Sequence, residues 1–113
     1  MFKRYFLFLA CFLCFCNAED TKAIISKSSE YILLDVRTAE EFKERHIEGA
    51  ILIPHTEIKE RAALELPNKE ALILIYCRSG RRSATATQEL ATLGYTKVHN
   101  LGGINEAAKS IAK

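Results

Sequence analysis

Beyond residue 30, apolar runs of strand length alternate with segments that have helical spacing. Three runs are continuously apolar, at residues 31–34, 50–53 and 71–76, and a fourth strand is expected at residues 97–101. Continuous apolar runs are typical of strands that are covered on both faces. Strands that alternate with helices need crossover connections, so the pattern predicts an α/β fold, a small parallel sheet with helices on both faces.

The segments between these runs have the marks of helices. Thr38 and Glu41 have the spacing of a capping box, in which the two side chains cap a helix start reciprocally. Ile58, Ala62 and Leu66 recur at helical spacing and predict one buried face. Further helices are expected at residues 82–93 and 104–111.

The first eighteen residues have the three-part pattern of a secretory signal peptide. Lys3 and Arg4 are followed by an unbroken apolar run at residues 5–16. Cys16 and Ala18 then place small residues at the positions that a signal peptidase reads. Twelve helical residues cover about 18 Å, less than the bilayer's hydrocarbon core of about 30 Å. We therefore predict cleavage after Ala18 and export, to the periplasm if the source is a Gram-negative bacterium.

Two other fates of this segment stay open. The segment could remain as an uncleaved membrane anchor, or Cys11 could carry a lipid, because Leu9-Ala10-Cys11 resembles a lipobox. With cleavage, residues 19–113 are expected to form one domain with no stable membrane association.

Removal of residues 1–18, the predicted leader, changes both charge and cysteine count. The whole chain has 113 residues and a formal charge of +2. The leader holds two basic residues and three of the four cysteines, so residues 19–113 have a formal charge of zero and one thiol, Cys77. Binding of nucleic acid needs a concentrated basic face, so we expect no such partner. A single thiol cannot form an internal disulfide and is either buried and inert or exposed and reactive.

The residues after Cys77 favour a reactive thiol. In parallel α/β sheets, ligands bind beyond the carboxyl ends of the strands, and Cys77 ends the most apolar run. A tight glycine-containing loop that leads into a helix presents backbone N–H groups to an anion, and nearby arginines add positive charge. Both effects lower a thiol pKa. We predict that Cys77 is an exposed nucleophile. The predicted substrate-binding residues are Arg78, Ser79, Gly80, Arg81, Arg82 and Ser83.

Other polar residues receive supporting roles. Asp35 and Arg37 lie at the end of the first predicted strand, where an ion pair would brace the cysteine loop. His55 and His99 have no cysteine or acidic partner at the spacing of metal ligands, so we expect no metal site and no cofactor.

The cysteine loop resembles a known active site. Residues 77–82 are similar to the six-residue active-site loop of rhodanese-like sulfurtransferases. Other segments resemble the same family in the same order, namely residues 34–37 with 41–42, 46–50 with 53–54, 94–95, and 101–104. Many family members carry a tryptophan shortly after the last segment, whereas this chain has none.

The resemblance implies a mechanism and its partners. The Cys77 thiolate would take the outer sulfur of thiosulfate as a persulfide and pass it to a thiophilic acceptor. The implied partners are a small anionic sulfur donor and a thiol or cyanide acceptor. A domain of 95 residues leaves no room for a second rhodanese domain, so we expect Cys77 to lie in an open, shallow pocket. We also expect a monomer.

Two alternatives use the same loop differently. Cysteine phosphatases and arsenate reductases usually hold five residues between cysteine and arginine. Four residues separate Cys77 from Arg82 here, which favours a sulfur atom over a tetrahedral oxyanion. A non-enzymatic persulfide carrier or binding module would form the same adduct but turn over poorly with small acceptors.

Overall fold

The computed structural model describes residues 30–112 of the chain, and the predicted leader lies outside the described residues. The elements, in chain order, are β1 (Ile32–Asp35), α2 (Ala39–Glu44), β2 (Ile51–Leu52), a 3-10 turn η2 (His55–Glu57), α3 (Ile58–Glu65), β3 (Ile73–Cys77), α4 (Arg81–Thr92), β4 (Val98–Gly103) and α5 (Ile104–Ile111). The four strands are parallel, in the order β2-β1-β3-β4. The predicted α/β class is confirmed.

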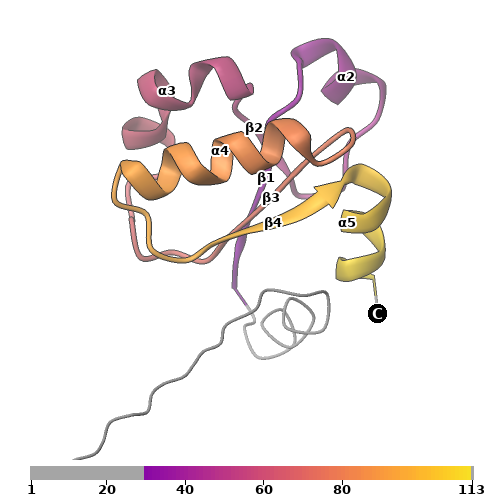
Figure 1. The fold of residues 1–113 in the computed structure, drawn as a ribbon. Coiled ribbons are helices and arrows are strands. Elements are labelled where there is room, and N and C mark those ends of the chain that lie inside the picture. Colours follow the sequence, from indigo (N-terminus) through magenta and orange to yellow (C-terminus); the bar gives the residue numbers. More distant parts are fainter. Residues whose placement is uncertain (1–29, 113) are drawn as a thin grey trace, which may run out of the picture.

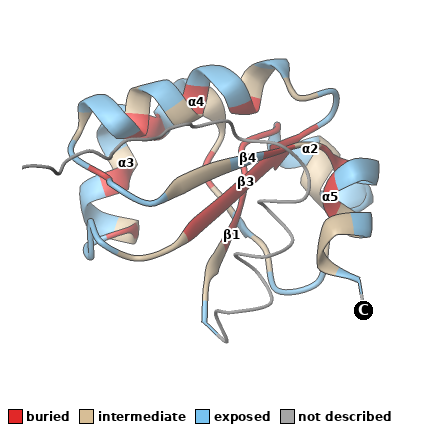
Figure 2. Ribbon diagram, turned by 60° about the horizontal axis from the view of Figure 1, so that its bottom comes forward, coloured by how far each residue is buried: buried red, intermediate tan, exposed pale blue. Residues whose placement is uncertain are grey.

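Helices cover both faces of the sheet, as the unbroken apolar runs predicted (Figure 1). On one face, α3 and α4 pack on the sheet through Ile58, Ala62 and Leu90. On the other face, Ile104 and Ala107 of α5 pack in a second cluster. The central strand β3 is buried along its whole length (Figure 2).

The strand ends differ from the prediction by one or two residues. β3 begins at Ile73 and runs through Cys77, so the cysteine is the last residue of the strand and not the first residue of the loop. β4 extends to Gly103, which pairs with Cys77. A register irregularity at Ile75/Tyr76 faces residues 100–102. Beyond it, the end of β4 lies against the cysteine loop.

The start of α2 forms as predicted. The Glu41 N–H donates to the Thr38 hydroxyl, and the Thr38 N–H donates to the Glu41 carboxylate. This capping box fixes the position of Glu41, and the same carboxylate also accepts hydrogen bonds from Arg82.

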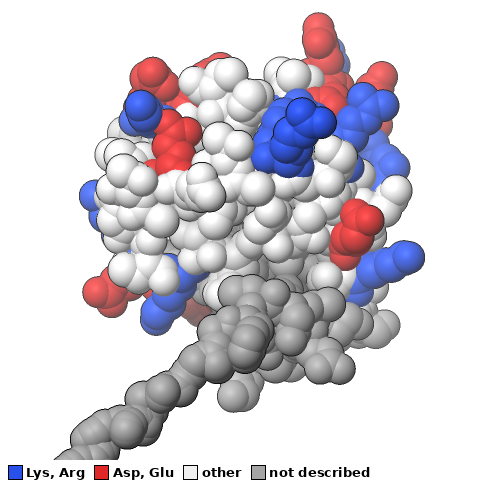
Figure 3. All heavy atoms as spheres, in the orientation of Figure 1, with Lys and Arg blue, Asp and Glu red and all other residues white. Residues whose placement is uncertain are grey.

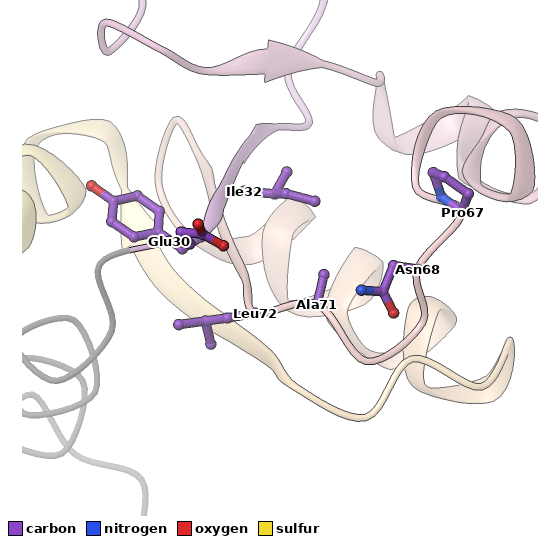
Figure 4. A pocket seen from close by; sticks show the side chains of 7 residues that line it. Glu30, Ile32, Pro67, Asn68, Ala71 and Leu72 are labelled. Atoms are coloured by element: carbon purple, nitrogen blue, oxygen red, sulfur yellow. The ribbon is translucent and has the colours of Figure 1, made fainter.

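One pocket lies away from the cysteine. It is lined by Ile32, Leu72 and residues 67–68 at the amino ends of β1 and β3 (Figure 4). Cys77 lies at the opposite end of the strands, because it is the last residue of β3. Within residues 30–112, no helix is long and apolar enough to cross a membrane.

Candidate active site

The Cys77 sulfur lies under the loop that follows it. The Gly80 N–H donates to the sulfur over 2.9 Å and the Ser83 N–H over 3.3 Å. Cys77 is fully buried and belongs to the core cluster on the α4 side of the sheet. The prediction of an exposed thiol in an open pocket is therefore wrong for this state. The reason is that β3 continues through the cysteine and the loop folds back over it.

Burial does not leave the thiol inert. Desolvation raises the pKa of Cys77, but hydrogen bonds from the Ser83 side chain and from the N–H groups of Ser83, Gly80 and Ser79 outweigh it, and the net pKa is lowered. Hydrogen bonds to a charged form favour that form. The sequence predicted this direction, with arginine charge as one cause. The structure adds that these donors are backbone N–H groups of the loop and the hydroxyl of Ser83.

Glycines let the loop close over the sulfur. Gly80 adopts the left-handed conformation at φ +101°, immediately before α4. A Cβ on Gly103 would lie 2.5 Å from the carbonyl oxygen of Arg78. Residue 103 must therefore be a glycine, because the loop backbone fills the space that its side chain would need.

The three loop arginines have different surroundings. Both terminal nitrogens of Arg82 donate hydrogen bonds to the Glu41 carboxylate, over 2.9 and 3.0 Å. The Arg78 side chain is 78% exposed and its Nη1 lies 3.9 Å from the same carboxylate. Arg81 is exposed at the first residue of α4. Basic side chains gather over the start of α4 and near α2 in Figure 3.

Asp35 and Arg37 pair with each other. Arg37 Nη2 lies 2.7 Å from the Asp35 carboxylate, and both residues are buried. The Arg37 guanidinium also donates to the Arg45 carbonyl and lies over the Tyr76 ring. These contacts hold the segment that carries α2. Asp35 and Arg37 were expected to support the cysteine loop directly. Their support is instead indirect, because they hold the segment that carries α2, and Glu41 of α2 binds Arg82.

Two residues of the site were not assigned to it from the sequence. Glu41 was interpreted as a helix cap and as part of a segment that resembles the family, and Asn100 received no role. Asn100 Oδ1 lies 2.7 Å from the Ser83 hydroxyl, and Glu41 contacts Arg82 across 41 residues of chain. Three arginines in one short loop are a signal that a carboxylate lies nearby, but no local spacing indicates which of the glutamates provides it.

The Glu41–Arg82 pair predicts a pH-dependent stability. Hydrogen bonds from Arg82 lower the pKa of Glu41 to about 2. A carboxyl whose pKa is lowered on folding stabilises the fold above its unfolded pKa of about 4.3, and this contribution is lost as the pH falls toward 2. We expect Glu41→Gln to lower the free energy of unfolding by roughly 1–2 kcal/mol at neutral pH. Urea unfolding from pH 7 downward should show this difference shrinking below about pH 4.5.

Glu57→Gln is the matched control for that measurement. Glu57 pairs with Arg61 near the start of α3, but its side chain is 50% exposed. An exposed pair contributes less than about 1 kcal/mol. A Glu41→Gln difference that is no larger than the Glu57→Gln difference, or that stays constant with pH, would contradict the bracing role of Glu41.

Comparison with known proteins identifies the fold and the loop. A family model described as a rhodanese-like domain matches residues 17–110. The thiosulfate sulfurtransferase PspE of Escherichia coli is 43% identical over 75 residues, which are 66% of this chain and 72% of that protein. Thiosulfate sulfurtransferase 18 of Arabidopsis thaliana is 36% identical over 99 residues, covering 77% and 71%.

A solved structure agrees with these relatives. A rhodanese with anions from E. coli superposes with a TM-score of 0.66 at 40% identity, covering 68% of this chain and 91% of that one. A parallel sheet with a cysteine loop at its carboxyl edge, together with these matches, places the chain in the rhodanese-like family. Within that family it is a sulfurtransferase, which acts on a sulfur donor and a sulfur acceptor.

Proposed function

We propose that the protein is a thiosulfate sulfurtransferase that carries sulfur on Cys77. The observation that carries this proposal is the set of N–H groups and the hydroxyl that converge on one buried sulfur and lower its pKa. Such donors stabilise a thiolate, which is the nucleophilic form of cysteine. We infer thiosulfate as the sulfur donor because the similar proteins are named thiosulfate sulfurtransferases.

The reaction has two displacements. In the first, the Cys77 thiolate attacks the outer sulfur of thiosulfate. A new sulfur–sulfur bond forms, the bond within thiosulfate breaks, and sulfite leaves with its electron pair. In the second, a nucleophilic acceptor such as cyanide attacks the outer sulfur of the persulfide. Thiocyanate forms and the Cys77 thiolate is regenerated, so no cofactor is consumed.

The loop contributes charge and orientation to both steps. Arg78 and Arg81 are exposed and attract the dianionic donor, while Arg82 is engaged by Glu41 and holds the start of α4 in place. The N–H groups of Gly80 and Ser83 stabilise the negative charge on sulfur. Because Cys77 is buried, the donor reaches it when the exposed outer part of the loop, residues 78–79, moves aside.

Turnover with two substrate classes tests this proposal. Thiosulfate with cyanide should give thiocyanate at a rate that depends on enzyme concentration, and p-nitrophenyl phosphate should give no comparable product release. Comparable rates on both substrates would favour a phosphatase and contradict the proposal.

A persulfide carrier is the second candidate. A putative sulfur carrier protein, YrkF of Bacillus subtilis, is 37% identical over 85 residues, 75% of this chain and 45% of that protein. A carrier would form the Cys77 persulfide and give it to a protein partner, with little turnover on cyanide. The mass of the Cys77 peptide after thiosulfate treatment, before and after cyanide is added, separates the two candidates.

We also propose that the protein is exported and cleaved, supported by the residue pattern of 1–18. Residues 19–113 would then be the mature domain, in the periplasm of a Gram-negative source. Expression of the full chain in a Gram-negative host and intact-mass measurement of the recovered protein should give a chain that begins at Glu19. An intact N-terminus or a lipid mass on Cys11 would contradict this.

A further inference from the structure

Ser83 has one hydroxyl proton and several neighbouring acceptors. Its Oγ lies 2.7 Å from Asn100 Oδ1 and 3.1 Å from the Gly80 carbonyl oxygen. The N–H of the same residue donates to the Cys77 sulfur, so Ser83 is adjacent to the nucleophile. The Ser83 hydroxyl is also near enough to that sulfur to act as a donor that lowers the thiol pKa. A single proton cannot serve all of these acceptors at once.

The amide orientation of Asn100 is fixed by a third residue. The Gly102 N–H donates to Asn100 Oδ1 over 2.8 Å, and a backbone N–H can only donate. The atom that faces Gly102 and Ser83 is therefore the amide oxygen, not the amide nitrogen. An amide oxygen only accepts, so the Ser83 hydroxyl must be the donor in the 2.7 Å contact.

We propose that Asn100 is a positioning residue whose amide oxygen competes with the Cys77 sulfur for the hydroxyl proton of Ser83. When the proton points to Asn100, the sulfur keeps only its backbone donors. When it turns to the sulfur, the thiolate gains a further donor. Asn100 thereby limits thiolate stabilisation and sets the pH range in which Cys77 reacts.

This inference rests on the proposed role of Cys77 as nucleophile, but its test does not need sulfur transfer. The rate of iodoacetamide alkylation at Cys77 is measured against pH in the full chain, with the Cys77 peptide followed by mass spectrometry. This separates Cys77 from the three leader cysteines. Failure of thiosulfate turnover would overturn the proposed function and leave the alkylation profile interpretable.

A double-mutant cycle gives the decisive comparison. Asn100→Ala should lower the apparent pKa of the Cys77 thiol by about half a pH unit or more, because the hydroxyl proton is freed for the sulfur. Ser83→Ala should raise it. In the Ser83→Ala background, Asn100→Ala should have no effect. An unchanged or raised pKa in Asn100→Ala, or an equal shift in both backgrounds, would overturn the proposal.

The other charged groups near the loop are unchanged in this cycle. They are Glu41, Asp35, Arg37, Arg78, Arg81, Arg82 and Glu106. Their influence on the thiol cancels when the two backgrounds are compared.

A second variant covers the case in which Asn100→Ala fails to fold. Asn100→Asp keeps an acceptor for the Gly102 N–H and binds the Ser83 proton more firmly. Its added charge raises the thiol pKa in both backgrounds, but the increase should be larger when Ser83 is present. An increase of the same size with and without the hydroxyl would overturn the proposal.

Discussion

Cys77→Ser should reduce thiosulfate:cyanide turnover by at least about a thousandfold, because a serine hydroxyl is a far weaker nucleophile and cannot carry sulfur as a persulfide. The fold should survive. The serine oxygen can accept the same N–H groups of Gly80 and Ser83 that Cys77 accepts. Since residue 77 is buried, a loss of about 1–2 kcal/mol in the free energy of unfolding is expected. Turnover is measured by thiocyanate formation and stability by urea unfolding.

In the full chain made by in vitro translation, where residues 1–18 stay attached, Cys14→Ser is the control for the loss of a thiol. It removes a cysteine of the predicted leader and should leave turnover unchanged. Turnover within about tenfold of the wild type in a folded Cys77→Ser variant would rule out Cys77 as the nucleophile. If Cys77→Ser does not fold, Cys77→Ala gives the same test of activity.

Gly103→Ala should displace the cysteine loop and lower turnover by at least about tenfold. The added methyl would lie 2.5 Å from the Arg78 carbonyl oxygen and 2.7 Å from Glu106 Oε1. The glutamate side chain can move away, but the carbonyl is part of the loop backbone that covers the sulfur. Overpacking of this kind costs about 1–3 kcal/mol of stability. Thiocyanate formation and urea unfolding measure the two effects.

Gly49→Ala separates loop displacement from general strain. Gly49 has φ +89°, and a Cβ there would meet no atom within 4 Å. Alanine in this conformation costs about 1 kcal/mol but touches nothing near Cys77. Turnover should stay within about twofold of the wild type in Gly49→Ala. Equal losses of turnover in the two variants would mean that stability, not loop position, governs activity.

The fold was predictable because its signals are local. The apolar runs that form β1 and β3 have no polar face to expose to water, so both faces of these strands are expected to be buried. The spacing of Thr38 and Glu41 is enough by itself to indicate the start of a helix. The cysteine loop was also predictable as a chemical unit, since thiol, glycine and arginines lie within six residues. Its matches to the rhodanese-like family follow from the same local segments.

The parts that sequence could not supply depend on distant contacts. From the sequence, Arg82 was expected to be available for substrate. In the structure its guanidinium hydrogen-bonds to Glu41 of α2, which is 41 residues away along the chain. Cys77 appeared exposed because the loop follows it, whereas the end of β4 and the fold-back of the loop bury it. Such contacts depend on the order of the strands in the sheet, and no pattern within one segment specifies that order.

The most direct test of the account is the mass of Cys77 after exposure to thiosulfate. The full chain is treated with thiosulfate, freed of excess donor, and the Cys77 peptide is examined by mass spectrometry, before and after cyanide is added. We predict an added mass of about 32 Da, one sulfur atom, on this peptide, and its loss with stoichiometric thiocyanate when cyanide is added. A persulfide that persists in cyanide would indicate a carrier. An unmodified Cys77, with thiocyanate still produced, would contradict sulfur transfer through this residue.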